Sequence, residues 1–207
     1  MPRRPYETTW EDWLLGGGAK AAFTNPDRPL VVEIGPGEDD FLLDMAREHP
    51  GTNWLGIEYS HKRVDRYARL AAEQGVGADN LRLLWRPASD VVERFLSPSQ
   101  VEKFHIHFPD PWPKKHHARY RLFAGPFAAS LERSLVPGGE IVLATDSPEY
   151  AAQIHEGLSA VPGMRSAYPA PGWVRLAPGA RVTVFEERWR ALGRNIHQLR
   201  YVKSASP

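Results

Sequence analysis

The sequence predicts an α/β fold with a doubly wound, mostly parallel sheet and helices on both of its faces. Five β-rich runs alternate with segments of helical periodicity, which is the order that successive βα units produce. Prolines and glycines separate these segments. A length of 207 residues, with 42% hydrophobic and 25% charged residues, suits one globular domain. In such a fold, ligands bind beyond the carboxyl ends of the strands, near the point where the strand order reverses.

The first two βα units have the clearest patterns. Leu30–Ile34 is an apolar run that ends in glycines, and apolar side chains recur at helical spacing over residues 41–46. Asn53–Glu58 is again β-rich. Apolar residues at helical spacing over 64–71 follow Ser60, a residue type that favours the N-cap position. We therefore expect two strand–helix units in this part of the chain.

The remaining elements continue the alternation. Three further β-rich runs are Leu81–Trp85, residues 104–108 and residues 141–144. The helical patterns that follow them are residues 91–96, residues 122–135 and a segment that begins at Ser147 and Pro148, an N-cap residue with proline in the first turn. The last third is less regular. Its clearest strand is residues 182–185, which we expect to complete the edge of the sheet.

Composition narrows the class of protein. There is no cysteine, which excludes disulfides, thiolate metal sites and a cysteine nucleophile. The sequence has neither a secretory signal nor an apolar stretch of about 18 residues, so we expect a cytoplasmic protein with no membrane partner. The net charge of +1 means that any nucleic-acid footprint must be local. We expect residues 1–25 to form a partly flexible N-terminal arm and residues 26–207 to form the domain.

Candidate site residues stand at the ends of the predicted strands. They are Glu33 with Gly35 and Gly37, then Glu58, Ala88, Asp110 and Asp146. Because the carboxyl ends of parallel strands meet at one edge of a sheet, we expect a ligand to bind among them.

The glycine-containing loop after the first strand favours a particular cofactor. Gly35 and Gly37 allow a tight turn and a close approach of the backbone to a ligand. A dinucleotide fingerprint has its third glycine where this chain has Asp40. Glu38, Asp39 and Asp40 would also repel a pyrophosphate, which disfavours NAD and ATP. S-adenosylmethionine carries no phosphate and has a cationic ammonium and sulfonium, so it is compatible with an acidic loop.

Two carboxylates near this loop have alternative interpretations. Glu58 lies 21 residues after Gly37, close to the interval of about 20 residues at which a carboxylate accepts hydrogen bonds from a ribose. The alternative for Glu58 is a solvated surface acid. The alternative for Glu33 is a carboxylate that only caps backbone amides.

The segment FPDPWPKK, residues 108–115, combines features suited to a nucleobase. Two prolines stiffen the loop around Asp110, and Trp112 adds a flat aromatic surface. A basic strip follows, consisting of Lys114, Lys115, Arg119 and Arg121 with His116 and His117 between them. A carboxylate, a ring and cations together suit a base flipped into a pocket beside its phosphates. The alternatives are a proline-stiffened turn that packs its tryptophan and a solvated charged loop.

These motifs together identify a family. The chain resembles the bacterial tRNA (guanine-N7-)-methyltransferases, which modify a guanosine in the variable loop of tRNA. The resemblance rests on EIGPG from Glu33, LGIEYS from Leu55, FPDPWPKKHH from Phe108, PGGEIVLATDSPEY from Pro137 and TVFE from Thr183. It implies a Rossmann-like class I methyltransferase fold with a seven-stranded sheet.

The resemblance also implies roles for residues. It places S-adenosylmethionine near Glu33, Glu58, Ala88 and Asp110, with Gly35 and Gly37 in the cofactor loop. It places tRNA at Lys114, Asp146, Thr183, Val184, Phe185 and Glu186. The chain departs from the family at Asp39, where glycine is usual, at Pro87, where an acid is usual, and at His116, His117 and Tyr120, where arginine is more common.

Guanine N7 has a free lone pair, so methyl transfer to it needs no general base. We expect Asp110 to be the catalytic residue, accepting hydrogen bonds from the guanine N1–H and N2 amino group as positive charge develops on the purine. The resemblance implies tRNA as the partner, and the chain is expected to act as a monomer or homodimer.

Three alternatives remain from the sequence. One is an exocyclic-amine methyltransferase, whose D-P-P-aromatic motif orders its residues differently. Another is a non-catalytic tRNA-binding protein with a decayed cofactor site, suggested by Asp39 and Pro87. The third is a metal site built from His105, His107, His116 and His117.

Overall fold

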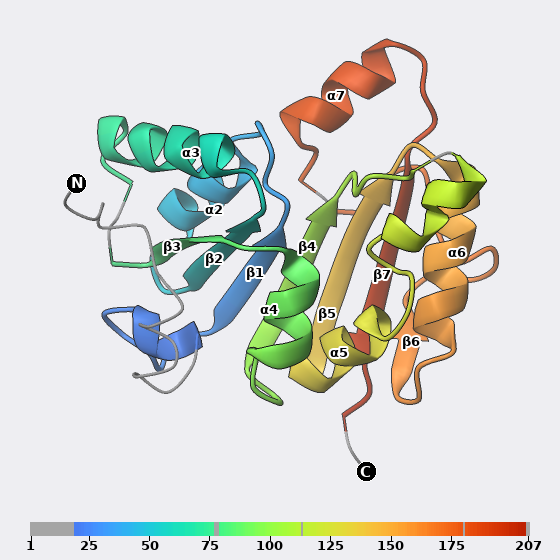
Figure 1. Ribbon diagram of the computed structural model, residues 1–207, viewed down its shortest axis with the longest axis horizontal. Coiled ribbons are helices and arrows are strands. Elements are labelled where there is room, and N and C mark those ends of the chain that lie inside the picture. Colours follow the sequence, from blue (N-terminus) through green and yellow to red (C-terminus); the bar gives the residue numbers. More distant parts are fainter. Residues whose placement is uncertain (1–18, 77–78, 113, 180, 206–207) are drawn as a thin grey trace.

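The computed structural model describes residues 19–76, 79–112, 114–179 and 181–205. Seven strands form one sheet in the order β3-β2-β1-β4-β5-β7-β6 (Figure 1). They are β1 (Leu30–Ile34), β2 (Asn53–Glu58), β3 (Leu81–Trp85), β4 (Val101–His107), β5 (Leu135–Thr145), β6 (Met164–Ser166) and β7 (His197–Lys203). Strands β1 to β5 are mutually parallel, whereas β7 pairs antiparallel with both β5 and β6. The predicted seven-stranded, mostly parallel sheet is confirmed.

Helices cover the two faces of this sheet in the manner of a doubly wound fold (Figure 1). The described helices are η1 (Ala19–Ala22), α2 (Phe41–Glu48), α3 (His61–Glu73), α4 (Ala88–Arg94), η2 (Lys115–Tyr120), α5 (Phe127–Ser134), α6 (Pro148–Ser159) and α7 (Val184–Ala191). Helices α2 and α3 bury one core cluster against β1, β2 and β3, and α4, α5 and α6 bury a larger cluster on the opposite face. The strand order reverses between β1 and β4, so the ligand edge predicted from the sequence is the edge at their carboxyl ends.

The predicted N-terminal arm is described only in part. Its residues 1–18 lie outside the described residues. Ala19 and Phe23 are buried in the larger core cluster, and Arg82 Nε donates to the carbonyl of Ala22 at 2.6 Å. The core therefore includes side chains that precede residue 26.

The strand predicted over residues 182–185 is wrong. This segment leads into α7, which begins at Val184. Thr183 is the N-cap, and its hydroxyl accepts a hydrogen bond from the Glu186 amide at 3.1 Å. The β-branched residues suggest a strand, but the Thr-x-x-Glu pattern is a helix start, and the local cap decides the structure. The edge of the sheet is completed by β6 and β7 instead.

Several predicted boundaries also shift. The helix predicted over 122–135 is helical only from Phe127 to Ser134, because Gly125 and Pro126 precede its first turn. Strand β5 then begins at Leu135, and its pairing with β4 shifts register between Val101 and Lys103. Helix α4 begins at Ala88 rather than at residue 91, and β4 runs over 101–107 rather than 104–108. None of the helices in the described part of the chain is long and apolar enough to span a membrane.

A candidate cofactor and RNA site at the carboxyl edge of the sheet

Two adjoining cavities lie at the carboxyl ends of β1, β2 and β4. The first, here called the β2–β4 cavity, has a volume of about 420 Å³, and its walls include Glu58, Tyr59, Pro87, Ala88, Ser89 and Trp112. The second, called the α7 cavity, has a volume of about 500 Å³, and its walls include Glu33, Gly37, Asp39, Thr183, Val184 and Phe185. Both are lined by Gly35, Arg63, His107, Phe108 and Asp110. The cavities thus form one cleft, and Asp110 stands at their junction.

The loop between β1 and α2 requires its glycines. Gly35 and Gly37 have φ angles of 69° and 66°, in the left-handed region that side chains with a Cβ rarely adopt. The amide of Gly35 donates to the Ile57 carbonyl at 2.9 Å, which joins the loop to β2. At these two positions the loop therefore presents backbone alone to the cleft.

Glu58 holds the same loop from the end of β2. Only 2% of its surface is exposed, which excludes the alternative of a solvated surface acid. Its Oε2 accepts a hydrogen bond from the Gly37 amide at 3.2 Å, and its Oε1 accepts one from the Ser60 amide at 2.9 Å. The carboxylate is thereby fixed in the wall of the β2–β4 cavity with further lone pairs available to a ligand.

Glu33 is buried and pairs with a histidine. Its Oε1 lies 3.1 Å from His107 Nδ1, so its described partner is a side chain rather than the backbone amides of the capping alternative. Oε2 is also buried, and among the described residues it has no hydrogen-bond partner. Burial raises the pKa of this carboxyl group, an effect that the hydrogen bond to His107 partly offsets. Glu33 lines the α7 cavity, and a buried acceptor without a partner at this place fits a cationic ligand.

The Phe108–Trp112 loop is held in an unusual conformation. Phe108 and Trp112 have φ angles of 51° and 42°, although neither is glycine. Such strain persists only where surrounding contacts impose it, and it is common at functional sites. Arg121 supplies the contacts: its guanidinium donates to the carbonyls of Pro111 at 2.6 Å and Trp112 at 3.3 Å. Between the strained residues, the exposed Asp110 has no hydrogen bond or ion pair within the described ranges.

Arg121 therefore holds the loop in place. Its position in the sequence suggests that it belongs to the exposed basic strip, but it does not. It is buried, and it also binds Gln153 at 2.6 Å and Glu149 at 3.0 Å on α6. The run of charge gave no sign of this, because only the fold brings the α6 side chains opposite Arg121.

Aromatic rings gather beside this loop. Trp112 remains 36% exposed rather than packed away, and its ring lies 5.5 Å from that of His117 and 5.6 Å from that of Tyr120. The Arg119 guanidinium lies over the Tyr120 ring at 4.9 Å. Lys114 is exposed next to the loop, whereas Pro113 lies outside the described residues. The cluster presents rings and cations at the mouth of the β2–β4 cavity, which Trp112 and Tyr120 line.

The residues expected to contact tRNA divide into two groups. Thr183, Val184 and Phe185 line the α7 cavity together with Asp110, and the Phe185 ring packs on Phe108 with 4.8 Å between centroids. Glu186 does not face that cavity.

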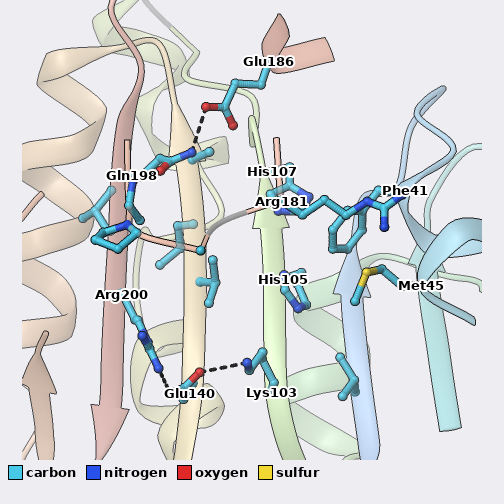
Figure 2. Close-up of a pocket in the computed structure, with 18 of the residues that line it drawn as sticks. Phe41, Met45, Lys103, His105, His107, Glu140, Arg181, Glu186, Gln198 and Arg200 are labelled. Carbon is cyan, nitrogen blue, oxygen red and sulfur yellow. Dashed lines mark hydrogen bonds and ion pairs between the residues drawn. The ribbon is translucent and has the colours of Figure 1, made fainter. Parts of the chain in front are cut away.

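Glu186 is buried and accepts hydrogen bonds from Gln198 Nε2 and Arg190 Nε, each at 2.8 Å. Figure 2 shows it directed toward Gln198, in a separate cavity of about 490 Å³ on the open face of β4, β5 and β7. Asp146 pairs with Arg194 beyond the end of β5 and lines neither half of the cleft.

The histidines of the metal alternative form two separate pairs. The rings of His105 and His107 lie 5.5 Å apart on β4, and those of His116 and His117 lie 4.0 Å apart in η2. Burial lowers the pKa of His105 well below its ordinary value. Within the described ranges, no group of three or more histidine, cysteine, aspartate or glutamate residues is arranged to hold a metal ion.

Comparison with known proteins assigns the chain to a family. A family model described as "Putative methyltransferase" matches residues 27–199. A tRNA (guanine-N(7)-)-methyltransferase of Cronobacter sakazakii is 35% identical over 84% of this chain and 72% of its own length. The enzyme of the same name from Burkholderia vietnamiensis is 34% identical over 98% of this chain and 75% of its own length. That from Treponema pallidum (strain Nichols) is 37% identical over 85% of this chain and 68% of its own length.

Solved structures agree on the fold. The 16S rRNA methyltransferase KamB superposes with a TM-score of 0.59 at 18% identity, covering 85% of this chain and 88% of that one. The antibiotic-resistance methyltransferase Kmr superposes with a TM-score of 0.57 at 16% identity, covering 86% and 88%. The cleft at the carboxyl edge of the sheet is thus carried by a Rossmann-like class I methyltransferase fold. From its sequence relatives and its matching family model, the chain belongs to the tRNA (guanine-N(7)-)-methyltransferase family.

Proposed function

We propose that this protein transfers the methyl group of S-adenosylmethionine to N7 of a guanosine in the variable loop of tRNA. The observation that carries the proposal is the position of Asp110, an exposed carboxylate at the junction of the two halves of the cleft. The β2–β4 cavity is lined by Glu58, the carboxylate expected to bind a ribose. The α7 cavity is lined by residues 183–185, the segment expected to contact the RNA. Membership of the family supports the same reaction.

The residues of the cleft fit the cofactor. S-adenosylmethionine, when bound, supplies an electrophilic methyl group on a cationic sulfonium. Glu58 is fixed to accept hydrogen bonds from ribose hydroxyls, and the unpartnered Oε2 of Glu33 is available to an ammonium. Asp110 adds a third carboxylate to the cleft. With Glu38 and Asp39, these acids outnumber the arginines that line the cleft, which are Arg63, Arg66 and Arg188. An excess of negative charge suits a cationic cofactor.

The acceptor nitrogen needs positioning more than activation. Because guanine N7 carries a free lone pair, no side chain has to remove a proton from it, and alignment of the reacting atoms supplies most of the acceleration. Asp110 accepts hydrogen bonds from the guanine N1–H and N2 amino group. Those bonds strengthen as the purine becomes cationic, so they stabilise the transition state more than the bound substrate.

The exposed groups around the cleft suit an RNA strand. The rings of Trp112 and Tyr120 offer a stacking surface for a base taken out of its stack. Lys114 and Arg119 are exposed cations beside those rings, at a place where they can neutralise phosphates.

A tRNA lacking the acceptor atom tests this proposal. Transcripts carrying 7-deazaguanosine have carbon in place of N7 but keep every exocyclic amine. With labelled S-adenosylmethionine, we expect methylation of the ordinary transcript and none of the 7-deaza transcript. Equal labelling of both would show that the acceptor is another atom, as an exocyclic-amine methyltransferase requires. Calorimetry with S-adenosylhomocysteine identifies a non-catalytic protein, which would bind tRNA and give no cofactor heat.

A further inference from the structure

Residues 181–185 contact α2 and the loop of residues 35–40 between β1 and α2, here called the cofactor loop. More than a hundred residues separate the two segments in sequence. Arg181 bridges Asp44 at 3.1 Å and Glu48 at 2.5 Å, both on α2. Four residues later, the Phe185 amide donates to Asp39 Oδ2 at 2.9 Å. These contacts join the two sides of the α7 cavity, whose walls come from the cofactor loop and from the start of α7.

Asp39 makes the connection nearest the cleft. Its Oδ1 accepts a hydrogen bond from the Phe41 amide at 2.9 Å while its Oδ2 accepts that of Phe185. Phe41 is the first residue of α2, and Phe185 is the second residue of α7. Amides in the first turn of a helix have no intrahelical acceptor, and a carboxylate there also gains from the helix dipole. One side chain thus accepts a first-turn amide from each of two helices.

The position of α7 makes this connection relevant to the cleft. Helix α7 lies beyond the carboxyl ends of β4 and β5 (Figure 1). Its Phe185 ring packs on Phe108, which is two residues before Asp110. Asp39 is two residues after Gly37, whose amide is held by Glu58. A displacement of the cofactor loop would therefore be transmitted through Asp39 to the start of α7.

We propose that Asp39 is a positioning residue that couples the cofactor loop to α7, so that a ligand bound at the loop also orders residues 183–185. The identity of the RNA that meets this segment rests on the function proposed above. The coupling itself rests only on the two hydrogen bonds of Asp39 and the placement of α7. By linkage, a cofactor that orders α7 raises the affinity for RNA, and RNA raises the affinity for the cofactor by the same factor.

Asp40 provides a matched control. It carries the same charge on the same loop, and its carboxylate pairs with Arg66 of α3 at 3.2 Å rather than with α7. Asp40→Ala removes an equal charge next to Asp39 and leaves both amide contacts of Asp39 in place. Any effect of net charge on the acidic loop appears in both variants, whereas loss of coupling appears only in Asp39→Ala.

Amide exchange measured by NMR tests the coupling without any tRNA. In the natural protein and in Asp40→Ala, S-adenosylhomocysteine should slow exchange of the Phe185 amide at least fivefold. In Asp39→Ala, that amide should exchange at least tenfold faster in the free protein, and S-adenosylhomocysteine should slow it less than twofold. If Asp39 serves only to cap α2, the Phe41 amide alone will exchange faster and the ligand will still protect Phe185, which overturns the proposal.

Methyl transfer provides a second measurement. The KM for tRNA should rise at least fivefold in Asp39→Ala, with kcat and the dissociation constant of S-adenosylhomocysteine in the absence of RNA changed less than twofold. An unchanged KM contradicts the proposal. If the natural protein methylates no tRNA, the proposed function fails, while the amide exchange of Phe185 still decides whether Asp39 couples the two elements.

Discussion

His107 Nδ1 lies 3.1 Å from Glu33 Oε1, and this pair joins neighbouring strands at the base of the cleft. Both side chains are largely buried, with 11% of His107 and 2% of Glu33 exposed. His107 lines both halves of the cleft and also the cavity on the open face of the sheet, where Figure 2 shows it on β4. The histidine therefore orients a buried carboxylate whose second oxygen is buried and has no partner within the described ranges.

The buried Glu33 should make stability fall as pH rises. Burial raises its pKa in the folded protein above the ordinary value of 4.5, so the folded state holds this proton more tightly than the unfolded state. The stability that this proton contributes is complete below about pH 4.5 and is lost as pH rises through the folded-state pKa. Glu33→Gln is neutral throughout, so its Tm relative to the natural protein should increase as pH rises above about 4.5. Glu156→Gln, at an exposed position on α6, should show no such trend, and parallel curves for Glu33→Gln would contradict a raised pKa.

Asp110→Asn tests the catalytic role. The carboxylate is exposed, so its replacement should leave the fold intact. Loss of a charge that stabilises the transition state should lower kcat by about 10²–10³, with tRNA affinity changed less than about threefold. Steady-state kinetics and filter binding measure the two effects. Equal losses in kcat and in affinity would mean that Asp110 only binds RNA.

Trp112 should contribute to RNA binding through its ring. Stacking of a base on an aromatic side chain is worth about 1–3 kcal/mol, so Trp112→Ala should raise the KM for tRNA by about 5-fold to 160-fold. Trp112→Phe should recover most of that loss. A phenylalanine variant as impaired as the alanine variant would rule out stacking as the main role.

Lys114 should contribute one phosphate contact. Lys114→Ala should weaken binding to all tRNAs alike, and the slope of log affinity against log salt concentration should decrease by about 1. The control is Arg165→Ala. Arg165 is exposed on edge strand β6 and pairs with Val202, which pairs with Glu140, five residues before the carboxyl end of β5. An unchanged slope for Lys114→Ala would remove Lys114 from the interface.

The sequence predicts the side of the sheet formed by β1, β2 and β3 because the pattern for these strands is local. Strands β1 to β3 are compact apolar runs whose residues are nearly all buried, and helix periodicity follows the first two of them. Strand β7 has no such run: Gln198 and Arg200 alternate with the buried Leu199 and Tyr201, and both polar side chains line the cavity on the open sheet face. A strand with one polar face is hard to recognise from the sequence unless the strand that it pairs with is known.

In the candidate site, too, the residues with a local sequence pattern could be predicted and those that depend on distant partners could not. Residues at strand ends, such as Glu58 and Asp110, are found from spacing alone because parallel strands bring their ends together. Arg121 holds the Phe108–Trp112 loop, and Glu186 binds Gln198. The role of Arg121 also depends on side chains of α6, which are distant in sequence. Neither role has a local pattern in the sequence.

Identification of the methylated nucleoside shows directly which atom of which base receives the methyl group. Unmodified tRNA is incubated with the protein and S-adenosylmethionine, digested, and analysed by mass spectrometry against nucleoside standards. We expect 7-methylguanosine from a fragment containing the variable loop, and none when that guanosine is replaced by adenosine. N6-methyladenosine, or no methylated nucleoside despite bound cofactor, would contradict it.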